Sequence, residues 1–188
     1  MNVICCDDNS MHLGLIQNFI KSSSLSPSDP ITVVGTFVNG ALGAQGFEDL
    51  KKKGTKIDLI TLDIRMPTMD GLSALVLIRK IDKSVKVIMA SSEDENTVTR
   101  KSNKVVDMPV IERMALLKNV VNRIESKKLE AGKINFILDA CEELHLNPFD
   151  VAKHLGANGY LHKPYTLEKT KAVLAHVMSG GSFVAKVG

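Results

Sequence analysis

Two kinds of hydrophobic pattern alternate along the chain. Short runs rich in apolar and β-branched residues, which are typical of buried strands, occur at 3–6, 31–38, 57–62, 85–91 and 159–162. Segments whose apolar residues recur every three or four positions, which are typical of amphipathic helices, occur at 11–20, 41–53, 72–81 and 166–178. Because strands alternate with helices, the pattern predicts βαβ units and a doubly wound α/β fold with a parallel sheet.

The alternation is interrupted between the fourth and fifth strand-like runs. Residues 93–104 are polar, and Pro109 then begins a long helical pattern that ends at Gly132. Its apolar residues recur at steps of four and three, at Val110, Met114, Leu117, Val121 and Ile124. Two more helical segments are expected before the last strand, at 134–146 and 149–155.

Length and composition are those of an ordinary globular domain. The 188 residues fit one domain, or one domain with an insertion, and 44% of them are hydrophobic and 24% are charged. No apolar run approaches the ~20 residues of a membrane span, and Asp7 and Asp8 end the first run too early for a signal peptide. We therefore expect a soluble protein with no membrane insertion.

Charge and cysteine content limit the partners and the cellular compartment that we expect. The net charge of +3 is too small, and the aromatic residues are too few, to predict a nucleic-acid partner. The three cysteines are an odd number, and Cys5 and Cys6 are adjacent within an apolar run. We therefore expect buried, reduced thiols in a cytoplasmic protein.

Polar residues follow four of the expected strands. They are Asp7 with Asp8, then Asp63, Ser91 and Lys163. Each one alone has an ordinary explanation, since Asp caps helices, Ser forms turns and Lys is usually solvated. The carboxyl ends of parallel strands, however, meet at one edge of the sheet. The pattern therefore predicts three carboxylates, a hydroxyl and an ammonium at one site.

This combination of groups suits phosphoryl transfer. Three neighbouring carboxylates cannot all stay ionised without a compensating cation, and magnesium prefers oxygen ligands of this kind. Asp63 could then attack a phosphoryl group and form an acyl phosphate. Lys163 would balance charge on the transferring group, and Ser91 would donate a hydrogen bond to one of its oxygens.

The pattern resembles the receiver domains of two-component response regulators, particularly the single-domain chemotaxis type. The resemblance covers about 1–92 and 155–180. It rests on Asp7-Asp8 after the first strand, the segment Asp63-Ile64-Arg65-Met66-Pro67-Thr68-Met69-Asp70-Gly71, Ser91 after the fourth strand, Tyr160 within the fifth, and Lys163-Pro164 at its end.

The family likeness implies a fold and a phosphorylated residue. The expected fold is a flavodoxin-like, five-stranded parallel sheet of order 2-1-3-4-5, in a single receiver domain that spans 1–188. By this likeness Asp63 receives a phosphoryl group from a histidine kinase, and the protein signals through a phosphorylation-dependent contact with a downstream protein. We expect no further enzyme activity beyond this self-catalysed transfer and the slow hydrolysis that follows.

The likeness also implies roles for the residues around Asp63. Asp8, Asp63 and the backbone carbonyl of Arg65 would bind magnesium directly, and Asp7 would act mainly through water. Ser91 and Tyr160 would form the conformational switch. The Lys163–Pro164 peptide bond would be cis.

One long segment departs from the family pattern. From Ser91 to Lys163 the chain advances 72 positions, whereas similar receivers cover this interval in twenty-odd, so roughly fifty residues are extra. We expect a helical hairpin at about 105–147, within the region 93–154 and before a shortened fourth helix. It is either a structural addition that packs on the receiver or on a second copy, as in a homodimer, or a docking element for a partner.

Two alternatives and one kinetic hypothesis remain at this point. The chain could be a receiver-fold binding module that acts through the insertion without phosphorylation. It could also be an aspartyl phosphohydrolase, although such enzymes carry a second Asp where this chain has Arg65. We further hypothesise that Arg65 pairs with Glu93 and covers the approach of hydrolytic water, so that phosphate is lost slowly.

Overall fold

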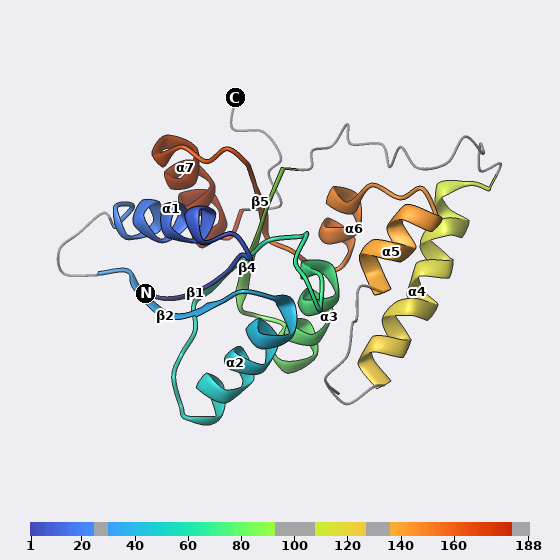
Figure 1. Ribbon diagram of the computed structural model, residues 1–188, viewed down its shortest axis with the longest axis horizontal. Helices are drawn as coiled ribbons and strands as arrows, with labels where there is room; N and C mark the ends of the chain where they lie inside the picture. The colour runs from blue at the N-terminus through green and yellow to red at the C-terminus, as the bar shows by residue number, and fades with distance from the viewer. Residues whose placement is uncertain (25–29, 93–107, 127–135, 182–188) are drawn as a thin grey trace.

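The fold is built on one parallel sheet with helices on both faces (Figure 1). The computed structural model describes residues 1–24, 30–92, 108–126 and 136–181. The strand order is β2-β1-β3-β4-β5, which confirms the predicted flavodoxin-like order. The strands are β1 (Asn2–Cys6), β2 (Thr32–Phe37), β3 (Leu59–Leu62), β4 (Lys86–Ser91) and β5 (Gly159–His162).

Alternating side chains of the strands divide the core into two layers. Helices α1 (Ser10–Lys21) and α7 (Leu167–Met178) cover one face, where Val3 and Leu59 are buried. Helices α2 (Gly40–Lys52) and α3 (Gly71–Ile81) cover the other, where Ile4 and Ile60 are buried. Successive residues of a strand point to opposite faces, so a strand buried on both sides reads as a continuous apolar run.

Three further helices form a third layer outside α3. They are α4 (Val110–Ser126), α5 (Phe136–Glu143) and α6 (Pro148–His154), and each of them contacts α3. Figure 1 shows them side by side on the flank of the molecule away from α1 and α7. Every residue of α3 from Gly71 to Ile78 is buried, and a helix that is apolar on all sides belongs inside a protein. The third layer therefore explains the composition of α3.

The apolar stripe predicted for the long helix faces inward over most of its length. Leu117 and Ile124 are buried, and Met114 and Val121 are partly buried against the core. Val110 is the exception, because it begins α4 and is 58% exposed. Residues 93–104 and Gly132 lie outside the described residues.

Side-chain caps account for where several helices begin. The capping side chain accepts a hydrogen bond from a backbone N–H of the first turn, which would otherwise have no partner. These caps are Asn9 for α1, Asn39 for α2, Asp70 for α3, Asn147 for α6 and Thr166 for α7.

The cysteines are free and buried, as predicted. Burial raises the pKa of the Cys5 thiol to about 11 and also raises the pKa of Cys6 above its ordinary value. These thiols therefore pack as small apolar groups. Within the described parts of the chain, no helix has the length and apolar character that a bilayer crossing requires.

Candidate functional site

The four predicted strand ends meet at the carboxyl edge of the sheet. The backbone N–H of Asp63 donates to the carbonyl of Cys6 over 2.9 Å, which continues the pairing of β1 with β3 by one residue. The N–H of Lys163 donates to the carbonyl of Ser91 over 2.8 Å and continues the pairing of β4 with β5 in the same way. The pairing of the strands thus fixes the positions of these residues relative to one another at the edge of the sheet.

The ammonium group of Lys163 joins two of the carboxylates. Its Nζ lies 2.9 Å from Oδ2 of Asp7 and 2.9 Å from Oδ2 of Asp63. Only 9% of Lys163 and 2% of Asp7 is exposed, so these ion pairs are largely shielded from water. The Lys163–Pro164 peptide bond is cis, as the family likeness implied.

Three carboxylates gather around this lysine. Ligand oxygens of Asp7, Asp8 and Asp63 all lie within 4.8 Å of one another. Asp7 and Asp63 are buried, whereas Asp8 is exposed and opens the cluster to solvent. Lys163 compensates one negative charge of the three, and hard oxygen donors in this number suit a divalent cation such as magnesium. The donor set therefore fits the predicted metal.

Burial raises the pKa of the Asp63 carboxyl to about 6. The nearby Lys163 ammonium opposes this rise, and the negative charges of Asp7 and Asp8 add to it. The ionised form of Asp63 is thus unusually costly in the protein without a bound cation. Carboxyls whose pKa is shifted by burial beside a charged partner occur preferentially at functional sites.

The turn after Asp63 brings the backbone unusually close to that residue. A Cβ on Gly71 would lie 1.9 Å from the carbonyl oxygen of Asp63, so only glycine fits there. The N–H of Gly71 donates to the carbonyl of Ile64 over 2.8 Å, and Thr68 has a positive φ of 68°. This tight turn connects Asp63 to the beginning of α3.

Tyr165 belongs to the site, although it was not among the predicted residues. Its hydroxyl donates to Oδ2 of Asp7 over 3.3 Å, and its ring centroid lies 5.9 Å from Nζ of Lys163. Burial, with added repulsion from Asp7 and Asp63, raises the pKa of Tyr165 well above its usual range, so it stays a hydrogen-bond donor. The feature of the sequence that could have identified Tyr165 as a site residue is its position two residues after Lys163.

His12 also lies beside the acidic cluster. Its Nδ1 is 3.9 Å from Oδ1 of Asp7, and its ring meets that of Tyr165 edge to face, with the centroids 6.1 Å apart. Nothing in the apolar pattern of 11–20 distinguishes this histidine, so it could not be predicted from the sequence.

The two predicted switch residues are buried near this edge. Ser91 is 1% exposed and ends β4, and Tyr160 is 3% exposed within β5. The Tyr160 ring packs against Phe149 of α6, with centroids 4.9 Å apart and planes at 60°. This contact links the predicted switch residue to the third layer, and its role as a switch stays a prediction.

Arg65 reaches the third layer as well. Its Nη1 donates to Oε1 of Glu142 in α5 over 3.2 Å. Glu93, the partner that we hypothesised for Arg65, lies outside the described residues. Glu142 was not predicted, because 77 positions separate the two residues and only the packing of α5 on α3 brings them together.

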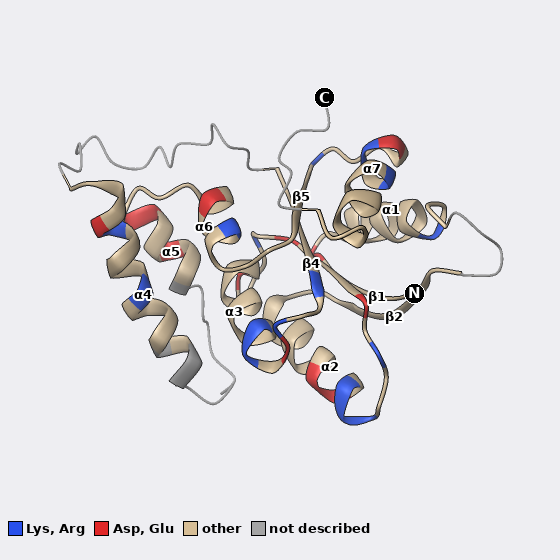
Figure 2. Ribbon diagram, turned by 180° about the vertical axis from the view of Figure 1, so that it is seen from behind, with Lys and Arg blue, Asp and Glu red and all other residues tan. Residues whose placement is uncertain are grey.

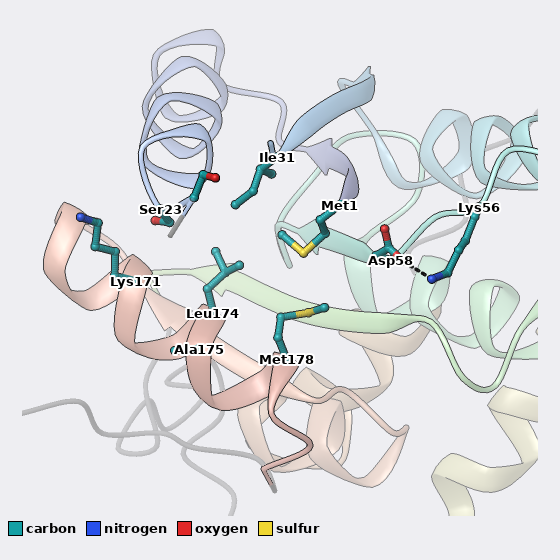
Figure 3. Close-up of a pocket in the computed structure, with 10 residues that line it drawn as sticks. Met1, Ser23, Ile31, Lys56, Asp58, Lys171, Leu174, Ala175 and Met178 are labelled. Atoms are coloured by element: carbon teal, nitrogen blue, oxygen red, sulfur yellow. Dashed lines mark ion pairs between the residues drawn. The ribbon is translucent and has the colours of Figure 1, made fainter. Parts of the chain in front are cut away.

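The opposite edge of the sheet has different features. Lysines and arginines gather there, at the end of α2 and at the end of α3 (Figure 2). A cavity of about 480 Å³ opens on the same side, between the ends of α1 and α7. Figure 3 shows its apolar lining, with Leu174 and Met178, and the Lys56–Asp58 ion pair of 3.0 Å at its rim. Neither feature contributes to the acidic site.

Comparison with known sequences points to one family. The model of the response regulator receiver domain matches residues 3–125. The chemotaxis protein CheY of Listeria monocytogenes is 35% identical over 92 residues, which make up 49% of this chain and 68% of that protein. A protein-glutamate methylesterase/protein-glutamine glutaminase of Maricaulis maris is 36% identical over 103 residues, or 55% of this chain. The matched part is only 22% of that enzyme's length.

Solved structures agree in fold. The response regulator domain of Thermotoga maritima CheB has a TM-score of 0.54 at 20% identity, over 96% of this chain and 95% of that one. The CheX–CheY complex of Borrelia burgdorferi, crystallised with BeF3 and Mg, has a TM-score of 0.54 at 22% identity, over 96% and 88% of the two chains. The sheet order, the acidic edge and the family match lead to one conclusion: the chain belongs to the response regulator receiver domain family, and chemotaxis-type receivers are among its relatives.

Proposed function

We propose that this protein is a phosphoacceptor response regulator that takes a phosphoryl group from a histidine kinase onto Asp63. The observation that carries the proposal is the Lys163 ammonium, which lies 2.9 Å from both Asp7 and Asp63 at an edge where Asp8 opens to solvent. A module without phosphoryl chemistry gains nothing from three crowded carboxylates, since like charges in a buried site destabilise it.

The transfer reaction follows from these positions. A carboxylate oxygen of Asp63 attacks phosphorus, the bond between phosphorus and the kinase histidine breaks, and the electron pair of that bond stays on the histidine nitrogen. Lys163 places positive charge beside the Asp63 oxygen, and Ser91 donates a hydrogen bond to a phosphoryl oxygen. Tyr165 keeps Asp7 oriented. When bound, magnesium neutralises charge on the carboxylates and on the phosphoryl oxygens.

Asp7, Asp8, Asp63 and the backbone carbonyl of Arg65 are the groups proposed to hold that magnesium. Asp8 and Asp63 would bind it directly, and Asp7 through water. The spacing of the three carboxylates supports this assignment, since their oxygens already lie within 4.8 Å of one another.

The output is proposed to be a protein contact in a chemotaxis-type pathway. Supporting this are the relatives, which are named as chemotaxis proteins and as protein-glutamate methylesterases/protein-glutamine glutaminases. We propose a single receiver domain over 1–188, with a helical insertion at about 105–147, in the region 93–154, that adds a surface for the target protein or for a second copy. Free, buried cysteines support a cytoplasmic setting.

Intact mass spectrometry would test the proposal. The protein is incubated with magnesium and acetyl phosphate, and one phosphoryl adduct is expected. It should disappear in Asp63→Asn and when magnesium is chelated. Asp150→Asn, which removes an exposed carboxylate from α6, is the matched control and should keep the adduct. Failure of the wild-type protein to form an adduct would instead support the binding module that acts without phosphorylation.

A further inference from the structure

Helix α5 is attached at both ends to the segment that follows Asp63. At its beginning, the N–H of Ile137 donates to Oγ of Ser73 over 3.2 Å, and the N–H of Leu138 donates to the carboxylate of Asp70. At its end, Glu142 accepts from Arg65 over 3.2 Å. The helix therefore spans the turn between the phosphoacceptor and α3.

These two attachments differ in their exposure to water. Asp70 and Ser73 are completely buried, so hydrogen bonds between them and α5 are costly to break. The side chains of Arg65 and Glu142 are 49% and 24% exposed, and an ion pair of that kind is weak and readily exchanged. Of the two attachments, only the ion pair at the end of α5 can therefore break and form again readily.

A phosphoryl group on Asp63 would compete with Glu142 for the same cation. Two residues of chain span at most about 7 Å, so the Asp63 carboxylate is within the range of an arginine side chain at position 65. The phosphoryl group carries about two negative charges, about one more than the Asp63 carboxylate that it replaces, and guanidinium binds phosphate with two parallel hydrogen bonds. Asp7, Asp8 and a phosphorylated Asp63 would together carry about four negative charges, and magnesium and Lys163, which is shared between Asp7 and Asp63, would compensate three of them. Charge is therefore left on the phosphoryl group for a further cation.

We propose that Arg65 alternates between two anions, Glu142 in the unphosphorylated protein and the phosphoryl group in the phosphorylated protein. Glu142 is a positioning residue that acts through Arg65. The inference rests on the proposed function and deepens it, because it joins the insertion to the chemical state of Asp63.

The exchange has a kinetic consequence and a structural one. In hydrolysis, a water oxygen bonds to phosphorus as the bond from phosphorus to the Asp63 oxygen breaks, which releases phosphate and restores the carboxylate. Arg65 on the phosphoryl group covers this approach of water and slows the reaction. At the same time the ion pair between Arg65 and Glu142 is lost, so the end of α5 loses its attachment to the turn after Asp63. It keeps the hydrogen bonds that Arg113 of α4 donates to the carbonyls of Leu144 and His145 over 3.1 and 2.8 Å.

The lifetime of the phosphoryl group tests the exchange. Wild-type protein and variants are phosphorylated with magnesium and acetyl phosphate, freed of the donor, and followed by phosphate release. Glu142→Gln removes the competing anion, so the lifetime should lengthen about two- to fivefold, the range that a partly exposed ion pair supports. Glu143→Gln changes the next residue of the same helix, which is exposed, and should leave the lifetime unchanged.

A second pair of variants separates positioning from a structural effect. Arg65→Gln should shorten the lifetime, and adding Glu142→Gln to it should have no further effect, because Glu142 acts only through Arg65. A Glu142→Gln lifetime equal to wild type, or an effect that persists without Arg65, would overturn the inference while the proposed function stands. Absence of any adduct on the wild-type protein would overturn both.

Hydrogen exchange gives an independent measurement of the same event. Phosphorylation of the wild-type protein should speed amide exchange in the last turn of α5 and leave the first turn protected by Asp70 and Ser73. In unphosphorylated Glu142→Gln the last turn should already exchange quickly. Equal exchange in the last turn before and after phosphorylation of the wild-type protein would contradict the release of Glu142.

Discussion

Ser73 makes two hydrogen bonds to the carboxylate of Asp70, and its hydroxyl also connects α3 to the third layer. The backbone N–H of Ser73 donates to one carboxylate oxygen over 2.8 Å, and its hydroxyl donates to the other over 2.7 Å. The same hydroxyl oxygen accepts from the N–H of Ile137 over 3.2 Å. Two buried side chains, the N-cap residue Asp70 and Ser73 in the first turn of α3, therefore cap the beginning of α3 and the beginning of α5 together.

Replacing Ser73 by alanine should lower the free energy of unfolding by about 1–3 kcal/mol. The change leaves the buried N–H of Ile137 without this acceptor and removes one donor from Asp70, and unsatisfied buried groups cost that much. Chemical denaturation measures the effect. Ser84→Ala is a matched control, because its hydroxyl also donates to a carboxylate, that of Asp82, but at an exposed site. A loss in Ser73→Ala no larger than that in Ser84→Ala would show that the joint cap is unimportant.

Much of the fold was predictable because the short apolar runs of the strands are easily distinguished from the three- and four-residue spacing of the helices. The runs at 3–6 and 85–91 became β1 and β4 within one residue, and the structure confirms the strand order that the family likeness implied. The long helix was less well predicted at its start. Val110 fits the apolar spacing but is 58% exposed, because spacing along one helix does not show where the neighbouring layer ends.

The site was predictable where it depends on strand ends and was missed where it depends on tertiary packing. Asp63 and Lys163 meet because parallel strands end at one edge. Glu142 meets Arg65 only because α5 packs on α3. Tyr165 follows the last strand, but its orientation toward Asp7 depends on the turn, which apolar spacing does not describe. Contacts between residues far apart in the sequence are therefore the part of the site that could not be predicted from a single sequence.

Gly71→Ala should disrupt both the fold and the phosphoacceptor. A methyl group there would lie 1.9 Å from the carbonyl oxygen of Asp63, so the turn must move and Asp63 must move with it. We expect a loss of at least about 2 kcal/mol in the free energy of unfolding, typical of forced backbone shifts in packed regions, and little phosphoryl adduct. Gly14→Ala is the control, because no atom lies within 4 Å of the added group. It should stabilise α1 by about 0.5–1 kcal/mol. Similar stabilities for the two variants would contradict the steric argument.

Lys163→Gln should destabilise the protein at pH 7.5 by about 3–5 kcal/mol. The change leaves Asp7 and Asp63 as buried charges without the ammonium that lies 2.9 Å from each. The loss should shrink toward pH 5, because the pKa of Asp63, already raised, rises further when its cation is removed. Thermal unfolding at several pH values measures this. Lys169→Gln, at an exposed position of α7, should change stability by less than about 0.5 kcal/mol at either pH.

Asp63→Asn should stabilise the metal-free protein at neutral pH. Burial raises the pKa of Asp63 to about 6 from an ordinary 3.8, against the opposing effect of Lys163. Between pH 3.8 and about pH 6 the Asp63 carboxyl holds its proton in the folded protein but loses it in the unfolded chain. The contribution of Asp63 to the free energy of unfolding therefore falls as the pH rises through that range. Above pH 6 the ionised carboxylate is a net cost, and replacing it by a neutral amide should raise the free energy of unfolding by about 1–3 kcal/mol. Thermal unfolding without magnesium should show this gain at pH 7.5 and a much smaller gain at pH 4.5. Asp150→Asn, at an exposed position, should show no such pH dependence, and an Asp63→Asn variant no more stable than wild type at pH 7.5 would contradict the assignment.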